Sequence, residues 1–130
     1  MLFRSNDTAT TENMFGDILS DLTGELAGSL GIAPSLNASD DRAMAQAAHG
    51  SAPDIAGKGL ANPIAMVLSA GMLLDWLGTR HGDARLCDAA VRVDDGVRAA
   101  VRDGVSTRDL GGSASTGEFT DAVVARIAGA

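Results

Sequence analysis

Apolar residues recur every three or four positions in the first part of the chain. Between residues 15 and 30 they are Phe15, Ile18, Leu19, Leu22, Leu26 and Leu30. This spacing predicts an amphipathic helix. Gly24 and Gly28 lie inside the predicted helix, and Gly31 is placed to end it. Residues 32–41, with Pro34, Asn37 and Asp40 as turn formers, predict a loop or a short strand, and residues 43–48 predict a short buried strand.

The same spacing predicts two long helices further along the chain. The first begins at Pro63, with Asn62 as its N-cap, and runs to about Leu77, where Gly78 closes it. Its expected buried side comprises Ile64, Val67, Leu68, Gly71, Met72 and Leu74. The second runs from about Asp83 to Arg102 and is ended by Gly104. Its expected buried line comprises Leu86, Cys87, Ala90, Val91, Val97 and Val101.

A last helix is predicted near the end of the chain, after a loop rich in glycine and serine at residues 107–117. Ser115 and Glu118 have the spacing of a capping box. The helix that follows is expected to bury Phe119, Val123 and Ile127. The chain thus has two glycine-rich loops, one at residues 49–63 and the other at residues 107–117. Loops of this length inside compact domains are usually functional.

Composition limits the partners of this chain. Its 130 residues suffice for one domain, and its net charge of -7 argues against a nucleic-acid-binding or anionic membrane-binding face. The longest apolar run, residues 64–74, is shorter than the ~20 residues that a membrane span needs. The single cysteine, Cys87, excludes an internal disulfide and a cysteine-based zinc site. With no visible secretory signal, these features predict a cytoplasmic protein.

The first residues follow no helical or strand period. Residues 1–12 read MLFRSNDTATTE. We interpret them as a disordered tail or as a segment foreign to the protein, so that Met1 would not be the native start. The domain is accordingly expected to comprise residues 13–130.

Two aspartates lie one helical turn apart. Asp17 and Asp21 stand at positions i and i+4 of the first predicted helix, on the same face. Like charges so placed repel each other, and two converging carboxylates suit a hard cation such as Mg²⁺ or Mn²⁺. The alternative is an ordinary solvated acidic face. Two ligands are also too few for a complete site.

The segment from His49 to Asp54 reads HGSAPD. Its small residues leave backbone N–H groups open to a pyrophosphate, and Asp54 could accept hydrogen bonds from ribose hydroxyls. A carboxylate at this place would repel a 2′-phosphate and would favour NAD over NADP. The segment lacks the G-x-G-x-x-G fingerprint of dinucleotide-binding folds. A well-packed surface loop, with His49 as a structural histidine, is the alternative.

Three stretches together resemble one enzyme family. They are NMFGDILSD at residues 13–21, HGSAPDIAGKGLANP at residues 49–63, and DLGGSAST at residues 109–116. Their order and spacing are similar to the C-terminal third of the isocitrate and isopropylmalate dehydrogenases, which are metal-dependent, β-decarboxylating dehydrogenases of 2-hydroxy acids. The resemblance covers residues 13–130. It implies that the chain is the C-terminal fragment of an α/β three-layer fold, and that this fragment is mostly helical with a few short strands. It also implies a homodimer for the full-length enzyme.

The resemblance also implies roles for individual residues. Asp17 and Asp21 match the two aspartates that hold Mg or Mn, with a third aspartate supplied by the partner subunit. The residues that match the loop around the adenosine half of the cofactor are His49, Gly50, Ser51, Ala52, Asp54, Ile55 and Asn62. Family members that use NADP have Lys and Tyr where this chain has Asp54 and Ile55, so NAD is implied.

Some family features are missing from this chain. Many members read Glu-Pro-Val where this chain reads Gln46-Ala47-Ala48, which leaves the choice among isopropylmalate, isocitrate, tartrate, malate and homoisocitrate open. The chain has no tyrosine and only one lysine, Lys58. The family's catalytic Tyr and Lys pair is therefore expected upstream, and no catalytic residue in this chain. We expect either an inactive fragment of a dehydrogenase, with apolar helix sides exposed, or a non-catalytic nucleotide-binding or interaction module of the same fold.

Overall fold

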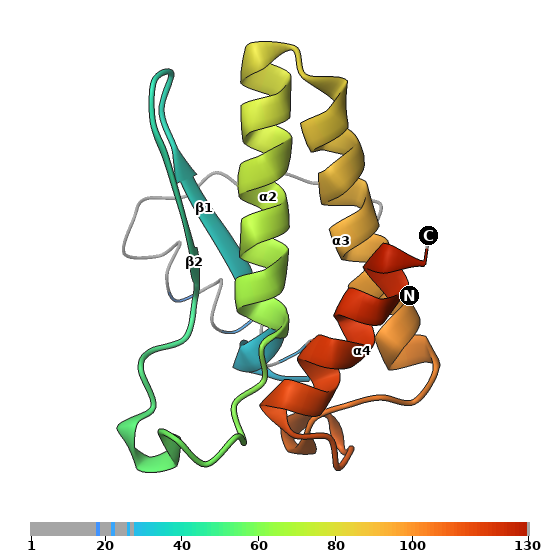
Figure 1. Cartoon of the computed structure of the whole chain (residues 1–130). Helices are drawn as coiled ribbons and strands as arrows, with labels where there is room; N and C mark the ends of the chain where they lie inside the picture. Colours follow the sequence, from blue (N-terminus) through green and yellow to red (C-terminus); the bar gives the residue numbers. More distant parts are fainter. Residues whose placement is uncertain (1–17, 19–21, 23–25, 27, 130) are drawn as a thin grey trace.

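A computed structural model describes residues 18, 22, 26 and 28–129 (Figure 1). Its elements are the 3-10 turns η1 (Leu30–Ile32), η2 (Pro53–Ile55) and η3 (Arg108–Leu110), the strands β1 (Pro34–Ala38) and β2 (Ala43–Ala47), and the helices α2 (Ile64–His81), α3 (Ala84–Arg102) and α4 (Thr116–Ala128). Within the described residues, none of the helices combines the length and the apolar character needed to cross a membrane. The chain is helix-dominated with two short strands, as expected.

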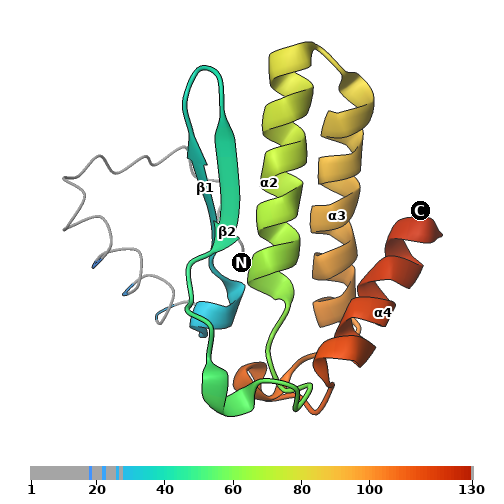
Figure 2. The ribbon, with the colours of Figure 1, turned by 60° about the vertical axis from the view of Figure 1, so that its left-hand side comes forward.

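The two strands form an antiparallel hairpin alongside α2 (Figure 2). Pro34 pairs with Ala47 at one end and Ala38 pairs with Ala43 at the other. The strand predicted at residues 43–48 is confirmed over residues 43–47, but the prediction that it is buried is wrong, because only Ala47 is buried and Met44 is 55% exposed. Residues 34–38 adopt the strand of the two alternatives left open for that segment, because β2 supplies the hydrogen-bonding partner that a lone extended segment lacks.

A fully buried serine in α2 joins this helix to both strands. The Ser69 hydroxyl lies 2.7 Å from the carbonyl oxygen of Gln46 in β2 and accepts a hydrogen bond from the Ser35 amide of β1 at 3.1 Å. It also lies 2.7 Å from the Ala65 carbonyl of its own helix. The one proton of this buried hydroxyl thus has carbonyl acceptors within reach, and its oxygen accepts an amide, so the polar group has the partners that burial requires.

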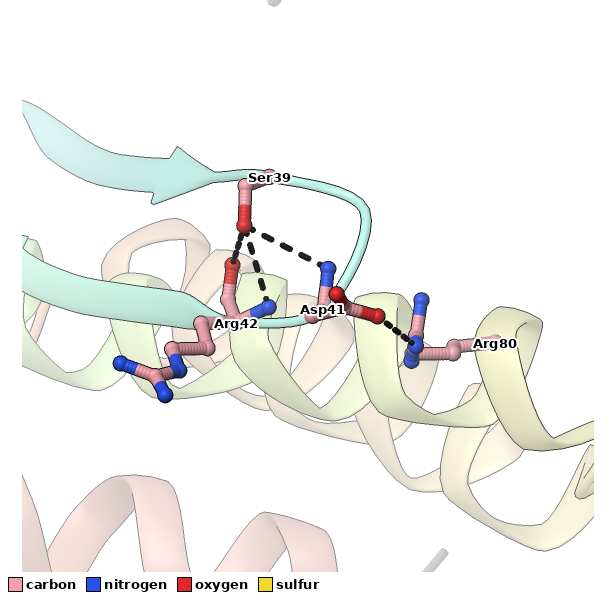
Figure 3. Close-up of polar contacts among 4 residues, drawn as sticks. All are labelled: Ser39, Asp41, Arg42 and Arg80. Carbon is pink, nitrogen blue, oxygen red and sulfur yellow. Dashed lines mark hydrogen bonds and ion pairs between the residues drawn. The ribbon is translucent and has the colours of Figure 1, made fainter.

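The tip of the hairpin contacts the last turns of α2 (Figure 3). Ser39 Oγ accepts hydrogen bonds from the amides of Asp41 and Arg42, which shapes the turn. Arg80 donates to Asp41 Oδ1 at 2.8 Å, and its guanidinium carbon lies 5.5 Å from the centre of the Trp76 ring. This exposed ion pair contributes little free energy, but it fixes where the tip lies.

The core lies where α2, α3 and α4 meet. α2 and α3 are antiparallel neighbours, and α4 packs across one end of α3 (Figures 1 and 2). The buried core side chains are Ile64, Val97, Ala100, Phe119 and Val123. The predicted burial of Phe119 and Val123 in α4 is confirmed, and Ile127 is partly buried against them. The predicted capping box of Ser115 and Glu118 is present at the start of α4.

Gly78 does not end α2, contrary to the prediction. The helix continues to His81, and Gly82 takes the left-handed conformation that ends it, with a φ of 64°. Gly78 is instead buried against the start of α3. A Cβ atom at Gly78 would lie 2.6 Å from Cys87 Sγ and 2.9 Å from the Cys87 backbone nitrogen. A glycine in this position therefore serves close packing of two helices rather than chain termination.

The first predicted helix also ends earlier than expected. Ile18, Leu22 and Leu26 are helical, but Gly28 has a φ of 117° and residues 30–32 form a 3-10 turn, so no helix reaches Gly31. The side chains of Ile18, Leu22 and Leu26 are exposed. Gly28 is thus outside the helix because its backbone conformation is not a helical one.

Some residues predicted to be buried on α2 and α3 are exposed. The exposed fractions of Met72, Val91 and Val101 are 39%, 59% and 40%. Met72 and Val91 line an open groove between the two helices, which also includes Leu68 and Gly71. No described residue packs over this groove, so the helices have apolar sides that face solvent, as the resemblance led us to expect.

We predict opposite effects of alanine at two helical glycines. Gly78→Ala should lower the free energy of unfolding by about 1–3 kcal/mol, because the new methyl group overlaps Cys87. Gly117→Ala in α4 is the matched control. No atom lies within 4 Å of a Cβ there, so it should raise that free energy by up to about 1 kcal/mol. Urea unfolding followed by circular dichroism measures both. Equal stabilisation by the two substitutions would show that Gly78 is not needed for helix contact.

Candidate functional site

The 49–63 loop connects β2 to α2 and carries all the predicted cofactor-binding residues. Five of them are exposed, namely His49, Gly50, Ser51, Ala52 and Asp54, whereas Ile55 is half-buried and Asn62 is buried. The structure thus places the first five on an accessible surface. It places Asn62 apart from them, at the other end of the loop beside α2.

The loop backbone has an unusual conformation at Ala52. Its φ of 42° and ψ of 62° lie in the left-handed region. Ala52 is the one non-glycine residue with a positive φ in the described part of the chain. The short turn η2 follows, closed by a hydrogen bond from the Ile55 amide to the Ala52 carbonyl at 3.1 Å. A left-handed alanine is unfavourable by roughly 1–2 kcal/mol, so the rest of the loop must hold it in place.

The loop also offers free donors and an acceptor. Within the described residues, the backbone amides of Gly50, Ser51 and Ala52 donate no hydrogen bond to another protein group. His49 Nδ1 lies 2.8 Å from the Gly50 carbonyl oxygen. Asp54 has an exposed carboxylate that forms no ion pair with any described residue. Unpaired amides suit phosphate oxygens, and a free carboxylate suits hydroxyl groups. The three amides therefore fit the pyrophosphate of a dinucleotide, and the Asp54 carboxylate fits its ribose.

Asn62 caps α2 and connects it to a second segment. Its Oδ1 accepts a hydrogen bond from the Ile64 amide at 3.0 Å, and its Nδ2 donates to Asp109 Oδ2 at 2.8 Å. The predicted capping role is present. The N-cap position itself is Pro63, one residue later than predicted, because Pro63 has a φ of -87° and a ψ of -4° while α2 begins at Ile64.

Asp109 begins the motif at residues 109–116, and the sequence alone predicts no role for its carboxylate. Its Oδ2 accepts hydrogen bonds from Ser29 Oγ at 2.5 Å and from Asn62 Nδ2, and its Oδ1 accepts one from Thr107 Oγ1 at 2.6 Å. Three segments that are far apart in the sequence therefore meet at one carboxylate. An acidic residue inside a glycine-rich loop is the one sequence signal that points to a role for Asp109. The sequence does not indicate which residues donate hydrogen bonds to its carboxylate.

The donors around Asp109 keep it ionised. Partial burial by itself raises the pKa of this carboxyl, but the hydrogen bonds from Ser29, Thr107 and Asn62, with one from its own backbone, outweigh that effect. The pKa of Asp109 is consequently below its ordinary value. Each of these bonds is made to the charged form, which is the form they stabilise.

Further contacts hold the 49–63 loop against the 107–117 loop (Figure 2). The Thr116 amide donates to the Gly59 carbonyl at 2.9 Å, and the Thr116 hydroxyl donates to the Ala61 carbonyl. A Cβ atom at Gly112 would lie 2.0 Å from the Ser106 carbonyl oxygen, so only glycine fits there. The two glycine-rich loops thus form one structural unit at the end of α2.

The predicted metal ligands Asp17 and Asp21 lie outside the described residues. Among the residues that are described, there is no group of three or more His, Cys, Asp or Glu side chains that could hold a metal ion. The metal site therefore stays a prediction from sequence.

Comparison with known proteins gives one consistent family. A family model described as isocitrate/isopropylmalate dehydrogenase matches residues 3–123. The isocitrate/homoisocitrate dehydrogenase of Thermus thermophilus is 52% identical over 118 residues, which are 91% of this chain and 33% of that protein. The 3-isopropylmalate dehydrogenase of Deinococcus radiodurans is also 52% identical over 118 residues, which are 91% of this chain and 32% of that protein.

A solved structure agrees with these relatives. The crystal structure of isocitrate dehydrogenase from Methylococcus capsulatus matches with a TM-score of 0.79 and 43% identity, covering 88% of this chain and 33% of that one. The chain spans about a third of the length of the curated relatives it matches. The family match begins at residue 3, and the assignment of residues 1–12 as a tail stays a prediction.

We predict that Asp109 makes the stability of the fold sensitive to acid. The pKa of Asp109 is lowered by folding, so its contribution is complete above its ordinary pKa and is lost as the pH falls through the folded value. Asp109→Asn should lower the free energy of unfolding near neutral pH by about 1 kcal/mol, a low value because the carboxylate is partly exposed. The difference between the two proteins should be constant above the ordinary pKa of an aspartate and should shrink steadily as the pH falls below it.

Urea unfolding at several pH values measures this difference. Asp83 and Glu118 also have lowered pKa values and are present in both proteins, so their effects cancel. A stability difference that stays constant from neutral to acid pH would contradict the assigned role of the Asp109 charge.

Proposed function

Because this chain belongs to the isocitrate/isopropylmalate dehydrogenase family, we propose that it is part of an NAD-dependent enzyme that oxidises and decarboxylates a 2-hydroxy acid. The observation that carries this proposal is the 49–63 loop, where three backbone amides and the Asp54 carboxylate have no partner among the described residues and fit a dinucleotide. The substrate is of the 3-isopropylmalate, isocitrate or tartrate type. Relatives named for different substrates are equally identical to this chain, so the proposal does not extend to one of them.

The loop residues would hold the adenosine half of NAD. The amides of Gly50, Ser51 and Ala52 are the proposed donors to the pyrophosphate. Asp54 would accept hydrogen bonds from the ribose hydroxyls and would repel a 2′-phosphate, which is why we propose NAD rather than NADP. His49 and Ile55 would border the adenosine, and Asn62 would bind the adenine from the side of α2.

Asp17 and Asp21 are the proposed ligands of Mg or Mn. A divalent ion bound in such a site acts as a Lewis acid toward the oxygens of a 2-hydroxy acid. The two carboxylates would hold the ion, and their spacing of four residues puts both on the same helical face. A third ligand from a partner subunit, and hence a homodimer, remains part of this proposal.

Proton transfer would be carried out by residues outside this chain. It contains no tyrosine, and its one lysine, Lys58, lies in the 49–63 loop. We therefore propose that the 130 residues alone do not turn over substrate. We also propose a cytoplasmic location, because a single cysteine, Cys87, suits a reducing compartment.

A first prediction concerns cofactor choice in the protein that carries this chain. Asp54→Lys combined with Ile55→Tyr should shift the ratio of kcat/KM for NADP to that for NAD by roughly 30-fold or more, because a repelling carboxylate is replaced by an attracting ammonium group. Steady-state kinetics with both cofactors measures the ratio. Asp121→Lys, at an exposed position of α4, makes a similar charge change elsewhere and should leave the ratio unchanged. An unchanged preference in the double variant would refute the role of Asp54.

A second prediction concerns the metal. Asp17→Asn and Asp21→Asn should each raise the Mg²⁺ or Mn²⁺ concentration needed for half-maximal activity by roughly 10- to 100-fold, because a charged ligand is lost. The affinity for NAD without metal should not change, since the 49–63 loop is intact. Asp40→Asn, at the exposed hairpin tip, is the control for general loss of charge. A metal requirement equal to that of the unsubstituted protein would remove both aspartates from the site.

A further inference from the structure

Asp109 lies against the one buried residue of the proposed cofactor loop. We infer that Asp109 is a positioning residue for the cofactor, which fixes the orientation of the Asn62 side-chain amide before the adenine binds. This inference rests on the proposed function, because it assigns Asp109 a part in binding the same nucleotide. Asp109 itself need not touch the cofactor.

The first step is the chemistry on the two sides of the Asn62 amide. An ionised carboxylate only accepts hydrogen bonds, and a backbone N–H only donates them. Asp109 therefore selects the Nδ2 side of the amide at 2.8 Å, and the Ile64 amide selects the Oδ1 side at 3.0 Å. If the amide were flipped, its Oδ1 would face the Asp109 carboxylate and its Nδ2 would face the Ile64 N–H, and neither pair could form a hydrogen bond. Both neighbours favour the same orientation. Without Asp109, only the hydrogen bond from the Ile64 amide would hold it, so the preference would be weaker.

The second step is what this orientation leaves for a ligand. Nδ2 carries two hydrogens, of which Asp109 takes one, and the other makes no hydrogen bond to any residue that the structure describes. Asn62 is only 9% exposed, so solvent has little access to it. The second N–H is thus a donor without a protein partner among the described residues, and such a donor complements the acceptor nitrogens of an adenine ring that lies against it.

The third step is that Asp109 is itself fixed. Thr107, which is fully buried, donates to its Oδ1, and Ser29 donates to its Oδ2. Gly111, with a φ of 79°, ends the turn that carries Asp109. Thr107 thus holds the carboxylate within its own loop independently of Asn62, and Ser29 adds a second bond from outside that loop. An amide oriented in advance binds more tightly than one that must be ordered on binding.

The experiment is a double-mutant cycle in the protein that carries this chain. The dissociation constants of NAD and of AMP are measured by titration calorimetry for the unsubstituted protein, Asp109→Ala, Asn62→Ala and the double variant. Asp109→Ala should weaken both ligands by about tenfold, the loss expected from one hydrogen bond. In the Asn62→Ala background, Asp109→Ala should have no further effect, because Asp109 acts through Asn62.

A control separates positioning from general loss of structure. Ser29→Ala removes another hydrogen bond to the same Oδ2 but leaves Asn62 bonded to it. It should lower stability while keeping both dissociation constants within about twofold. If Asp109→Ala does not fold, Asp109→Asn replaces it in the cycle with a smaller expected loss of two- to fivefold, since a neutral amide oxygen accepts more weakly.

The possible failures are distinguishable. Folded unsubstituted protein that binds neither NAD nor AMP would overturn the proposed function and this inference with it. NAD and AMP binding that is unchanged in the Asp109 variant would overturn only the positioning role. Losses that add fully in the double variant, or an equal loss in Ser29→Ala, would show that Asp109 supports the fold without acting through Asn62.

Discussion

The hydrogen bonds to the Asp109 carboxylate determine how the two glycine-rich loops lie together. Ser29 precedes the hairpin, Asn62 precedes α2, and Thr107 begins the loop before α4. Charge-assisted hydrogen bonds of this kind are stronger than neutral ones, and each donor is brought in by a different segment. The surface of the 49–63 loop, where we propose that the cofactor binds, therefore depends on an acid that lies outside that loop.

Close approach of the helices is the second constraint. Gly78 in α2 leaves room for Cys87, and Gly96 in α3 leaves room for Ile127 of α4, where a Cβ atom would lie 2.9 Å from the Ile127 side chain. A glycine inside a helix is less favourable than alanine by about 1 kcal/mol. The contact of the neighbouring helix offsets that cost, because close-packed side chains exclude water and gain dispersion energy.

The exposed apolar residues follow from the same arrangement. The described core is small and lies where α2, α3 and α4 meet, so none of the described residues covers the groove side of the α2 and α3 pair. The periodicity of these helices correctly marks them as amphipathic. It cannot distinguish apolar positions that face the core of this chain from those, such as Met72 and Val91, that face away from it.

Local patterns in the sequence correctly predicted the helices α2, α3 and α4, the strand at residues 43–47, the capping box at Ser115, and the three motifs that mark the family. These features are local, since a period, a cap or a motif is contained in a few neighbouring residues. Only the tertiary structure decided that Gly78 packs rather than terminates, that residues 34–38 are a strand, and that Asp109 binds Asn62. Each of these depends on a partner far away in the sequence, and a local pattern does not specify which distant group will be its neighbour.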